Sequence, residues 1–308
     1  MKVRVARGAL VALLVSVLLP LGSASATNPV NCFKSDSTLT VEFTQKGYDA
    51  RIVREGNDIR VHIDPTGSVT CPAGSDVNSV DTIQVTDLGR NNIGFTIDLS
   101  GGSFTPGLTA EATGVSEIEI FVNYSAGTTN QRLTIVGSAD PDSIQIGGFG
   151  FGGSGANLTG DGDVDDVQMS NVDLLTIEAG KGKDSVSAAG GPGFDMPYAG
   201  PLVIEGGNGN DKLETGADGA TLRGEGGRDL LVGSRKRDNL NGGPGNDTIL
   251  GGRGRDRLVG AAGDDVLRGN GGPDRLSGGP GDDLLVGGGG RDRCRGGPGT
   301  DTLRSCEA

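Results

Sequence analysis

The sequence predicts an all-β protein whose C-terminal third is a solenoid of short, regularly spaced turns and strands. Glycine accounts for 58 of the 308 residues, which is about 19% against an ordinary share of about 7%. No aromatic residue follows Tyr198, so the last third has no ordinary aromatic core. From Gly206, Asp and Leu recur every nine residues. This order does not fit a disordered segment, and glycine does not occupy every third position as in collagen.

The N-terminus has the pattern of a secretory signal. Lys2, Arg4 and Arg7 precede the apolar run 9–21, and Ala24-Ser25-Ala26 follows it. These features predict a signal peptide over residues 1–26, cleaved after Ala26. The apolar run is shorter than the ~20 residues that span a bilayer, so we expect a secreted, extracellular protein without membrane insertion.

Export makes the four cysteines readable as disulfides. Proximity in the sequence favours the pairs Cys32–Cys71 and Cys294–Cys306. Four cysteines allow three pairings, and free buried thiols are the alternative.

The charge distribution points to cations as partners. The formal net charge is −13; residues 27–205 carry 9 basic and 24 acidic side chains, and residues 206–304 carry 15 of each. An acidic chain of this kind is not expected to bind nucleic acid or an anionic membrane.

Residues 206–304 divide without a gap into eleven nonapeptides, from GGNGNDKLE to GGPGTDTLR. Position one is Gly and position six is Asp in ten of the eleven, and position eight is Leu or Ile in ten. The array resembles the RTX family with its hemolysin-type calcium-binding repeat, G-G-x-G-x-D-x-U-x. This resemblance implies a right-handed parallel β-roll in which six residues turn, three form a strand and two nonapeptides complete one coil.

The repeat also has the donor chemistry that Ca²⁺ prefers. Position-six aspartates supply carboxylate oxygens, and the glycines let backbone carbonyls approach an ion that takes six to eight oxygen ligands. The candidate ligands in the array are Asp211, Asp229, Asp238, Asp247, Asp256, Asp265, Asp274, Asp283, Asp292 and Asp301, with Gly207, Gly209, Gly243, Gly245, Gly252, Gly254, Gly279 and Gly281. Asp184, in the upstream copy AGKGKDSVS, is a further candidate. A single such Asp would be read as a solvated turn residue, but ten at one spacing are not.

The number of ions follows if each lies between repeats n and n+2. The odd-numbered repeats then offer five gaps with both aspartates, and the even-numbered repeats offer three. The remaining gap has Ala220 in place of Asp, and Lys236 and Arg235 lie in the repeat beside it, so it is expected to be weak or empty. The prediction is about eight Ca²⁺ ions.

Calcium binding and folding of the array are expected to be one event. Nonapeptides rich in glycine lose much conformational entropy on folding, and stacked aspartates repel one another without counterions. The metal-free array is therefore predicted to be largely unfolded. Arginines that recur at positions five and seven are interpreted as outward, solvated side chains; a polyanion-binding face is the alternative.

Weaker copies of the pattern precede the array. Segments beginning at Leu133, Leu175 and Leu202 share a seven-residue interval from Ile to Asp. They predict an irregular solenoid over 76–205, continuous with the roll over 206–304 and followed by a tail over 305–308; a separate β-sandwich is the alternative.

Residues 27–75 show the alternation of β-strands. Leu39, Val41 and Phe43 share one face, as do Ile59, Val61 and Ile63. They predict a disulfide-closed, β-hairpin-rich cap over the open end of the solenoid.

No enzymatic motif is present, so the protein is not expected to be an enzyme. His62 is the only histidine, and the sequence contains neither H-E-x-x-H, G-x-S-x-G nor a phosphate-binding loop. Asp161, Asp163 and Asp165 begin like an EF-hand, but Asp166 and Val172 stand where Gly and Glu belong.

The expected function is that of a secreted calcium-binding structural or interaction protein whose roll folds in extracellular Ca²⁺. Two alternatives stay open. One is a calcium-dependent polysaccharide-active β-helix enzyme that uses acidic residues such as Asp140, Asp142, Asp161 and Asp163. The other is a calcium-dependent adhesin or matrix component with a cell-surface or glycan partner.

Overall fold

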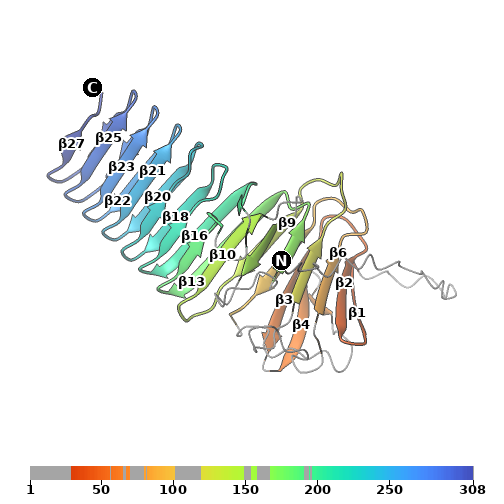
Figure 1. Ribbon diagram of the computed structural model, residues 1–308. Helices are drawn as coiled ribbons and strands as arrows, with labels where there is room; N and C mark the ends of the chain where they lie inside the picture. The colour runs from red at the N-terminus through yellow and green to blue at the C-terminus, as the bar shows by residue number, and fades with distance from the viewer. Residues whose placement is uncertain are drawn as a thin grey trace, which may run out of the picture.

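The computed structural model describes residues 29–55, 57–64, 67–69, 80, 82–100, 119–148, 154–157, 167–190, 194 and 196–307. Within these residues it is an all-β parallel roll without helices, as the sequence predicts. Two long sheets face each other along an elongated body, and the C-terminus lies at its far end (Figure 1). Residues 1–26, Cys71, Asp161, Asp163, Asp165 and Asp166 lie outside the described residues. No helix in the described part of the chain could cross a membrane.

One sheet has fifteen strands and the other has twelve. The fifteen-stranded sheet runs in the order β1 (Val30–Ser35), β2 (Thr38–Phe43), β6 (Thr82–Thr86), β8 (Glu119–Asn123), β12 (Val167–Ser170), β11 (Ser154–Asn157), β10 (Ser143–Gly148), β14 (Ser185–Ser187), β17 (Lys212–Glu214), β19 (Leu230–Val232), β21 (Thr248–Arg253), β23 (Val266–Gly271), β25 (Leu284–Gly289) and β27 (Thr302–Arg304), with β15 (Met196–Pro197) beside β10. The twelve-stranded sheet runs in the order β26 (Arg293–Arg295), β24 (Arg275–Ser277), β22 (Arg257–Ala262), β20 (Asn239–Pro244), β18 (Thr221–Gly226), β16 (Leu202–Gly209), β13 (Leu174–Gly182), β9 (Arg132–Val136), β7 (Gly94–Asp98), β3 (Asp49–Glu55), β4 (Asp58–Asp64) and β5 (Gly67–Val69).

In the array, each nonapeptide contributes one strand, and successive strands alternate between the two sheets. Strands 18 residues apart pair in parallel; Leu258 pairs with Leu276, for example. The position-eight side chains from Leu213 to Leu285 are buried between the sheets, because the middle residue of each strand points inward. Only the last one, Leu303, is exposed, at the end of the roll.

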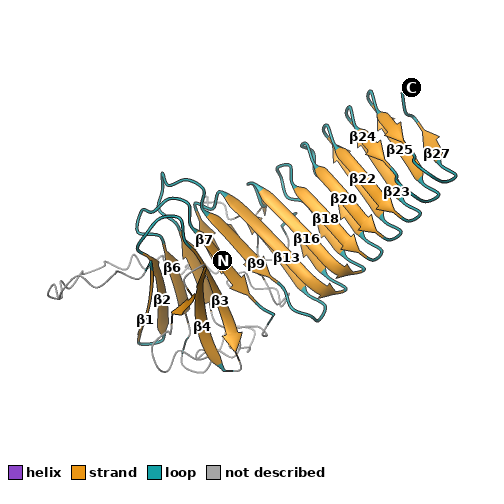
Figure 2. Ribbon diagram, turned by 180° about the vertical axis from the view of Figure 1, so that it is seen from behind, coloured by secondary structure: helices purple, strands orange, loops and turns teal. Residues whose placement is uncertain are grey.

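Upstream coils are longer and unequal but belong to the same two sheets. Leu175 pairs with Leu202 on one side and with Leu133 on the other. The core here is larger and includes the aromatic pair Phe43–Phe95, whose rings meet edge to face. Figure 2 shows these wider coils passing without a break into the narrow coils of the array.

The first parallel coil begins within the segment expected to form the cap. β2 pairs in parallel with β6, and β3 with β7. The antiparallel strands β1, β4 and β5 lie at the outer edges of the sheets. The expected inward faces of β2 and β4 are buried.

The disulfides fit the expected pairing where the structure describes them. Cys294 and Cys306 are bonded, which ties the C-terminal tail to β26. Cys32 is also in a disulfide.

Candidate calcium-binding edges

The position-six aspartates form two ladders, one along each edge of the roll. The odd edge carries the turns of odd-numbered nonapeptides, counted from Gly206, and the even edge carries the others. Every position-six aspartate from Asp211 to Asp292 is at most 2% exposed, whereas Asp301 in the last coil is half-buried. The turns therefore bring the predicted ligands together in two buried rows.

One oxygen of each carboxylate bonds to the neighbouring coil. Asp229 Oδ1 accepts the backbone N–H of Asp211 at 2.8 Å, and Asp256 Oδ1 accepts that of Asp238 at 2.9 Å. The same bond recurs along both edges as far as Asp301 and Asp292. The nine-residue period predicted that the aspartates stack from coil to coil. It did not predict this hydrogen bond, which fixes the register of successive coils.

The odd ladder also extends upstream of the array. The amide of Asp184 donates to Asp211 Oδ1, and the amide of Asp142 donates to Asp184 Oδ1, both at 2.8 Å. Asp184 was predicted as a ligand. Asp142 was not, although its distance from Ile135 equals that of Asp184 from Ile177 and could have assigned it to the same column.

The second carboxylate oxygen has no hydrogen-bond partner at most of these positions. The buried, unpartnered Oδ2 atoms are those of Asp184, Asp211, Asp229, Asp247, Asp256, Asp265, Asp274, Asp283 and Asp292. A buried anionic oxygen without a partner is strongly unfavourable. The row therefore needs bound cations or protons.

The pKa values of the aspartates show the same need. Burial raises the pKa of Asp247 and Asp256 to about 7, and neighbouring carboxylates add to the rise, whereas the backbone N–H bond opposes it. Burial likewise raises the pKa of Asp184, Asp229 and Asp265 to about 6. Without a cation, these carboxyls hold protons in a pH range where ordinary aspartates are ionised.

The glycines of the turns allow backbone carbonyl oxygens to lie close to the aspartate carboxylates. A Cβ on Gly224 at position one would lie 2.3 Å from Asp229 Oδ2 and 2.5 Å from the carbonyl oxygen of Gly242. A Cβ on Gly245 at position four would lie 1.5 Å from the carbonyl oxygen of Gly227, and its φ is +144°. The absence of side chains lets carboxylate and carbonyl oxygens approach each other, as the sequence predicted.

The predicted glycines share this close packing. All except Gly209 have positive φ: Gly207, Gly243, Gly245, Gly252, Gly254, Gly279 and Gly281. Gly209 instead fits against the carbonyl oxygen of Gly182, which would lie 1.5 Å from a Cβ.

The fourth nonapeptide differs from the others. Ser234 replaces glycine at position two, and its N–H and Oγ donate to Asp238 Oδ2 at 2.7 and 3.1 Å. Ser138 serves Asp142 in the same way, with its N–H at 2.7 Å. In these two turns a serine donates hydrogen bonds to the Oδ2 atom, which has no partner at most other positions of the ladders.

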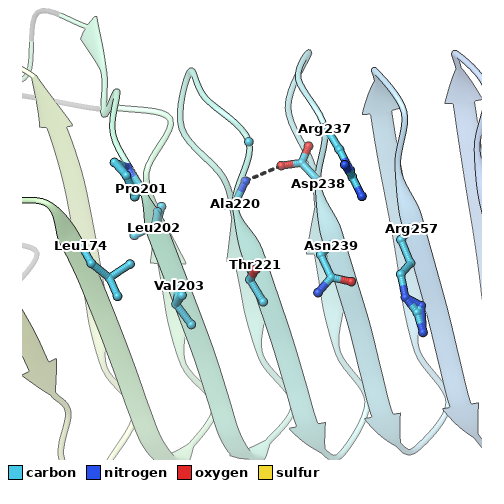
Figure 3. Close-up of a pocket in the computed structure, with 11 residues that line it drawn as sticks. Leu174, Pro201, Leu202, Val203, Ala220, Thr221, Arg237, Asp238, Asn239 and Arg257 are labelled. Atoms are coloured by element: carbon cyan, nitrogen blue, oxygen red, sulfur yellow. Dashed lines mark hydrogen bonds between the residues drawn. The ribbon is translucent and has the colours of Figure 1, made fainter. Parts of the chain in front are cut away.

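Ala220 leaves the neighbouring gap without a second carboxylate. Its amide donates to Asp238 Oδ1 at 2.7 Å, and no ionisable side chain extends from its own position (Figure 3). The gap between Ala220 and Asp238 therefore has one carboxylate, and both of its oxygens already accept protein hydrogen bonds. These contacts support the prediction that this gap is weak or empty.

The donor set of each gap suits calcium. Among the described residues, no three Asp, Glu, His or Cys side chains gather into one group. One gap thus offers at most two aspartates, and backbone carbonyls must supply the remaining ligands. Such all-oxygen sites fit Ca²⁺, which accepts many ligands in flexible geometry.

A parallel roll with a buried aspartate in the turns of nine of its eleven nonapeptides defines a calcium-binding β-roll protein. The family model of the RTX calcium-binding nonapeptide repeat (4 copies) matches residues 203–222, 223–258, 232–267, 250–274 and 268–303. The chain therefore carries RTX calcium-binding nonapeptide repeats across residues 203–303. No curated protein matches the chain.

Proposed function

We propose that the protein is a secreted structural or interaction protein whose roll folds when Ca²⁺ fills the gaps between stacked aspartates. The observation that carries the proposal is the row of nine buried Oδ2 atoms without partners. Bound Ca²⁺ would supply the positive charge that keeps these carboxylates ionised inside the fold.

The chain's own groups have separate tasks in this scheme. At most positions of the ladders, Oδ1 holds the amide of the preceding coil while Oδ2 is left to face an ion; the exception among the buried aspartates of the array is Asp238, whose Oδ2 accepts from Ser234. Eight gaps in the array contain two aspartates each, and the pair Asp184–Asp211 adds a comparable gap upstream. The gap at Ala220 lacks this arrangement.

Export agrees with this dependence on calcium. The pattern over residues 1–26 is that of a secretory signal, and extracellular calcium modules bind at about 10⁻⁴ to 10⁻³ M. A roll with such affinity stays unfolded where calcium is scarce and folds after release.

A calcium titration of the full chain followed by circular dichroism tests the proposal. We expect a cooperative gain of β signal and a higher midpoint in Asp256→Ala, because Asp256 faces two gaps. Asp218→Ala removes the same charge from an exposed residue of the array and should leave the midpoint unchanged. A β signal that is complete in chelator, or equal midpoints for both variants, would contradict the proposal.

We also propose that the protein is not catalytic. Asp142, one of the carboxylates considered for polysaccharide cleavage, accepts hydrogen bonds from Ser138 and belongs to the structural ladder. His62 lies half-exposed, 3.3 Å from the Glu55 carboxylate. Incubating the calcium-loaded chain with pectate or alginate should give no unsaturated product; sustained product formation would contradict this assignment.

A further inference from the structure

The exposed arginines of the roll gather on its even side. Arg257, Arg275 and Arg293 begin successive strands of the twelve-stranded sheet and are direct register partners. Further exposed arginines lie in the turns just before β20, β22 and β26. We call this set the arginine ladder: Arg237, Arg255, Arg257, Arg275, Arg291 and Arg293.

The opposite sheet has no such row. Its strands in the same coils begin with Val266, Leu284 and Thr302. The cations are thus sorted to one face of the roll rather than spread for solubility.

Most of the ladder has no carboxylate partner. Farther upstream in the same sheet, Arg132 Nη2 lies 2.7 Å from Asp49, and Arg223 pairs with Glu205 on the adjacent strand. Within the described residues, Arg257, Arg275 and Arg293 make no ion pair. Neighbouring strands lie about 4.8 Å apart, and like charges placed side by side are destabilising. An anion bound along the row would relieve this repulsion.

Two hollows along this face are lined by the ladder. One, of about 510 Å³, contains Arg237 and Arg257 beside Ala220 (Figure 3). The next, of about 430 Å³, is lined by Arg255, Arg275, Arg291 and Arg293. Glu307 of the C-terminal tail reaches the second hollow and pairs with Arg291 Nε at 3.2 Å. This contact shows a carboxylate bound on the ladder.

We propose that the arginine ladder binds a linear acidic polysaccharide that carries a carboxylate on every sugar ring and lies along the axis of the roll. Guanidinium groups bind planar carboxylates through paired hydrogen bonds, which an ammonium group does not reproduce. The inference rests on the proposed function, because the ladder exists only when calcium has folded the coils.

Other polyanions fit the face less well. The array has no aromatic side chain on which nucleic-acid bases could stack. An extended acidic peptide presents side chains on one face at about 6.7 Å intervals, which does not match rungs about 4.8 Å apart.

Calcium also favours the anion electrostatically. Asp256, Asp274 and Asp292 directly precede Arg257, Arg275 and Arg293, so ions held by these aspartates add positive charge behind the ladder. Without ions, the same aspartates reduce the positive field.

The test measures binding of tetragalacturonate to the full chain by calorimetry in calcium. The ladder variant combines Arg257→Gln, Arg275→Gln and Arg293→Gln. We expect its affinity to fall at least about tenfold and the affinity of the wild type to fall as salt is raised.

The matched control combines Lys212→Gln, Arg268→Gln and Arg304→Gln, three exposed cations on the other sheet. It makes the same change in net charge and should bind like the wild type. The proposal would be overturned if both variants lost affinity equally or if the ladder variant bound tetragalacturonate like the wild type. It would also be overturned if single-stranded DNA with four charges bound the wild type as tightly as tetragalacturonate, or more tightly.

Circular dichroism of the same samples separates the two proposals. A roll that folds with calcium but does not bind tetragalacturonate overturns the ladder proposal alone. A chain that fails to fold with calcium overturns the proposed function.

Discussion

The N-terminal coils and the array bury carboxylates in different ways. Asp87 is 1% exposed, and it accepts hydrogen bonds from Gly89 N–H and Ser125 N–H, both at 3.0 Å, and from Gln131 Nε2. Asp247 is equally buried, but its Oδ2 has no partner. Protein groups thus satisfy the buried charge of Asp87, whereas the Oδ2 atom of Asp247 is left for the ion that we propose.

The cores of the two regions differ in the same sense. Phe43, Phe95 and several isoleucines pack between the upstream sheets. In the array, only the position-eight aliphatic side chain of each nonapeptide from Leu213 to Leu285 packs between the sheets, and glycine is frequent. Apolar packing therefore decreases along one continuous solenoid, and in the proposed function calcium takes its place in the array.

The largest expected effect is that of a methyl group added where the turns are tightest. Gly245→Ala places Cβ 1.5 Å from the carbonyl oxygen of Gly227 at a φ of +144°. It should destabilise the calcium-loaded roll by about 3 kcal/mol or more. Gly289→Ala meets no atom nearer than 3.8 Å and should change stability by less than about 0.5 kcal/mol. Thermal unfolding in calcium measures both; equal effects would contradict the close packing of the turns.

Carboxylate-to-amide changes should have effects that are independent of calcium in the N-terminal coils and dependent on calcium in the array. Asp87→Asn should lower the free energy of unfolding by about 2 kcal/mol in calcium and in chelator alike. The NH₂ group of Asn would replace one carboxylate oxygen and would face an N–H donor instead of accepting its hydrogen bond.

Asp247→Asn should raise the calcium midpoint but not destabilise the metal-free chain, since it removes an uncompensated buried charge while its oxygen can still accept the Asp229 amide. Calcium titrations followed by circular dichroism measure the midpoint, and the β signal that remains in chelator measures the second response. A lower midpoint, or less β signal in chelator, for Asp247→Asn would remove the distinction between the regions.

Calcium binding by the array should depend on pH. The metal-free folded pKa of Asp247 and Asp256 is about 7, above the ordinary 3.8. Their contribution to the stability of the metal-free roll is therefore complete below about pH 3.8 and is lost as the pH rises through 7.

Protons and calcium compete for the same oxygens, so binding should release protons. The calcium midpoint should rise about tenfold from pH 8 to pH 6, since one pKa unit corresponds to about 1.4 kcal/mol. Titrations at both pH values, with a pH indicator to record proton release, measure this; a midpoint independent of pH would contradict the shifted pKa values.

The smallest expected effect is a gain. Ala261 occupies position two with a φ of +87°, where most other repeats have glycine. Ala261→Gly should stabilise the calcium-loaded roll by up to about 1 kcal/mol by relieving this strain. Thermal unfolding should show a higher midpoint than wild type, and a lower midpoint would contradict the strain at this position.

The regular array was predictable because its period places chemically identical residues at identical points of each coil. Asp247 and Gly245 could be assigned from the sequence, and so could the inward strands around Val41 and Val61. The position of Asp142 in the ladder was harder to assign, because the coils around it differ in length. The bond from Asp229 N–H to Asp247 Oδ1 depends on the orientation of a side chain, which the period does not specify. The arginine ladder required the assignment of alternate repeats to opposite sheets before its charge could be seen as one-sided.

Hydrogen exchange of the full chain in calcium and in excess chelator shows whether calcium holds the array folded. We predict that the amides of β21 to β25 lose their protection in chelator, whereas those of β6 to β9 keep theirs. Equal protection of β21 to β25 in both conditions would show that the array folds without calcium.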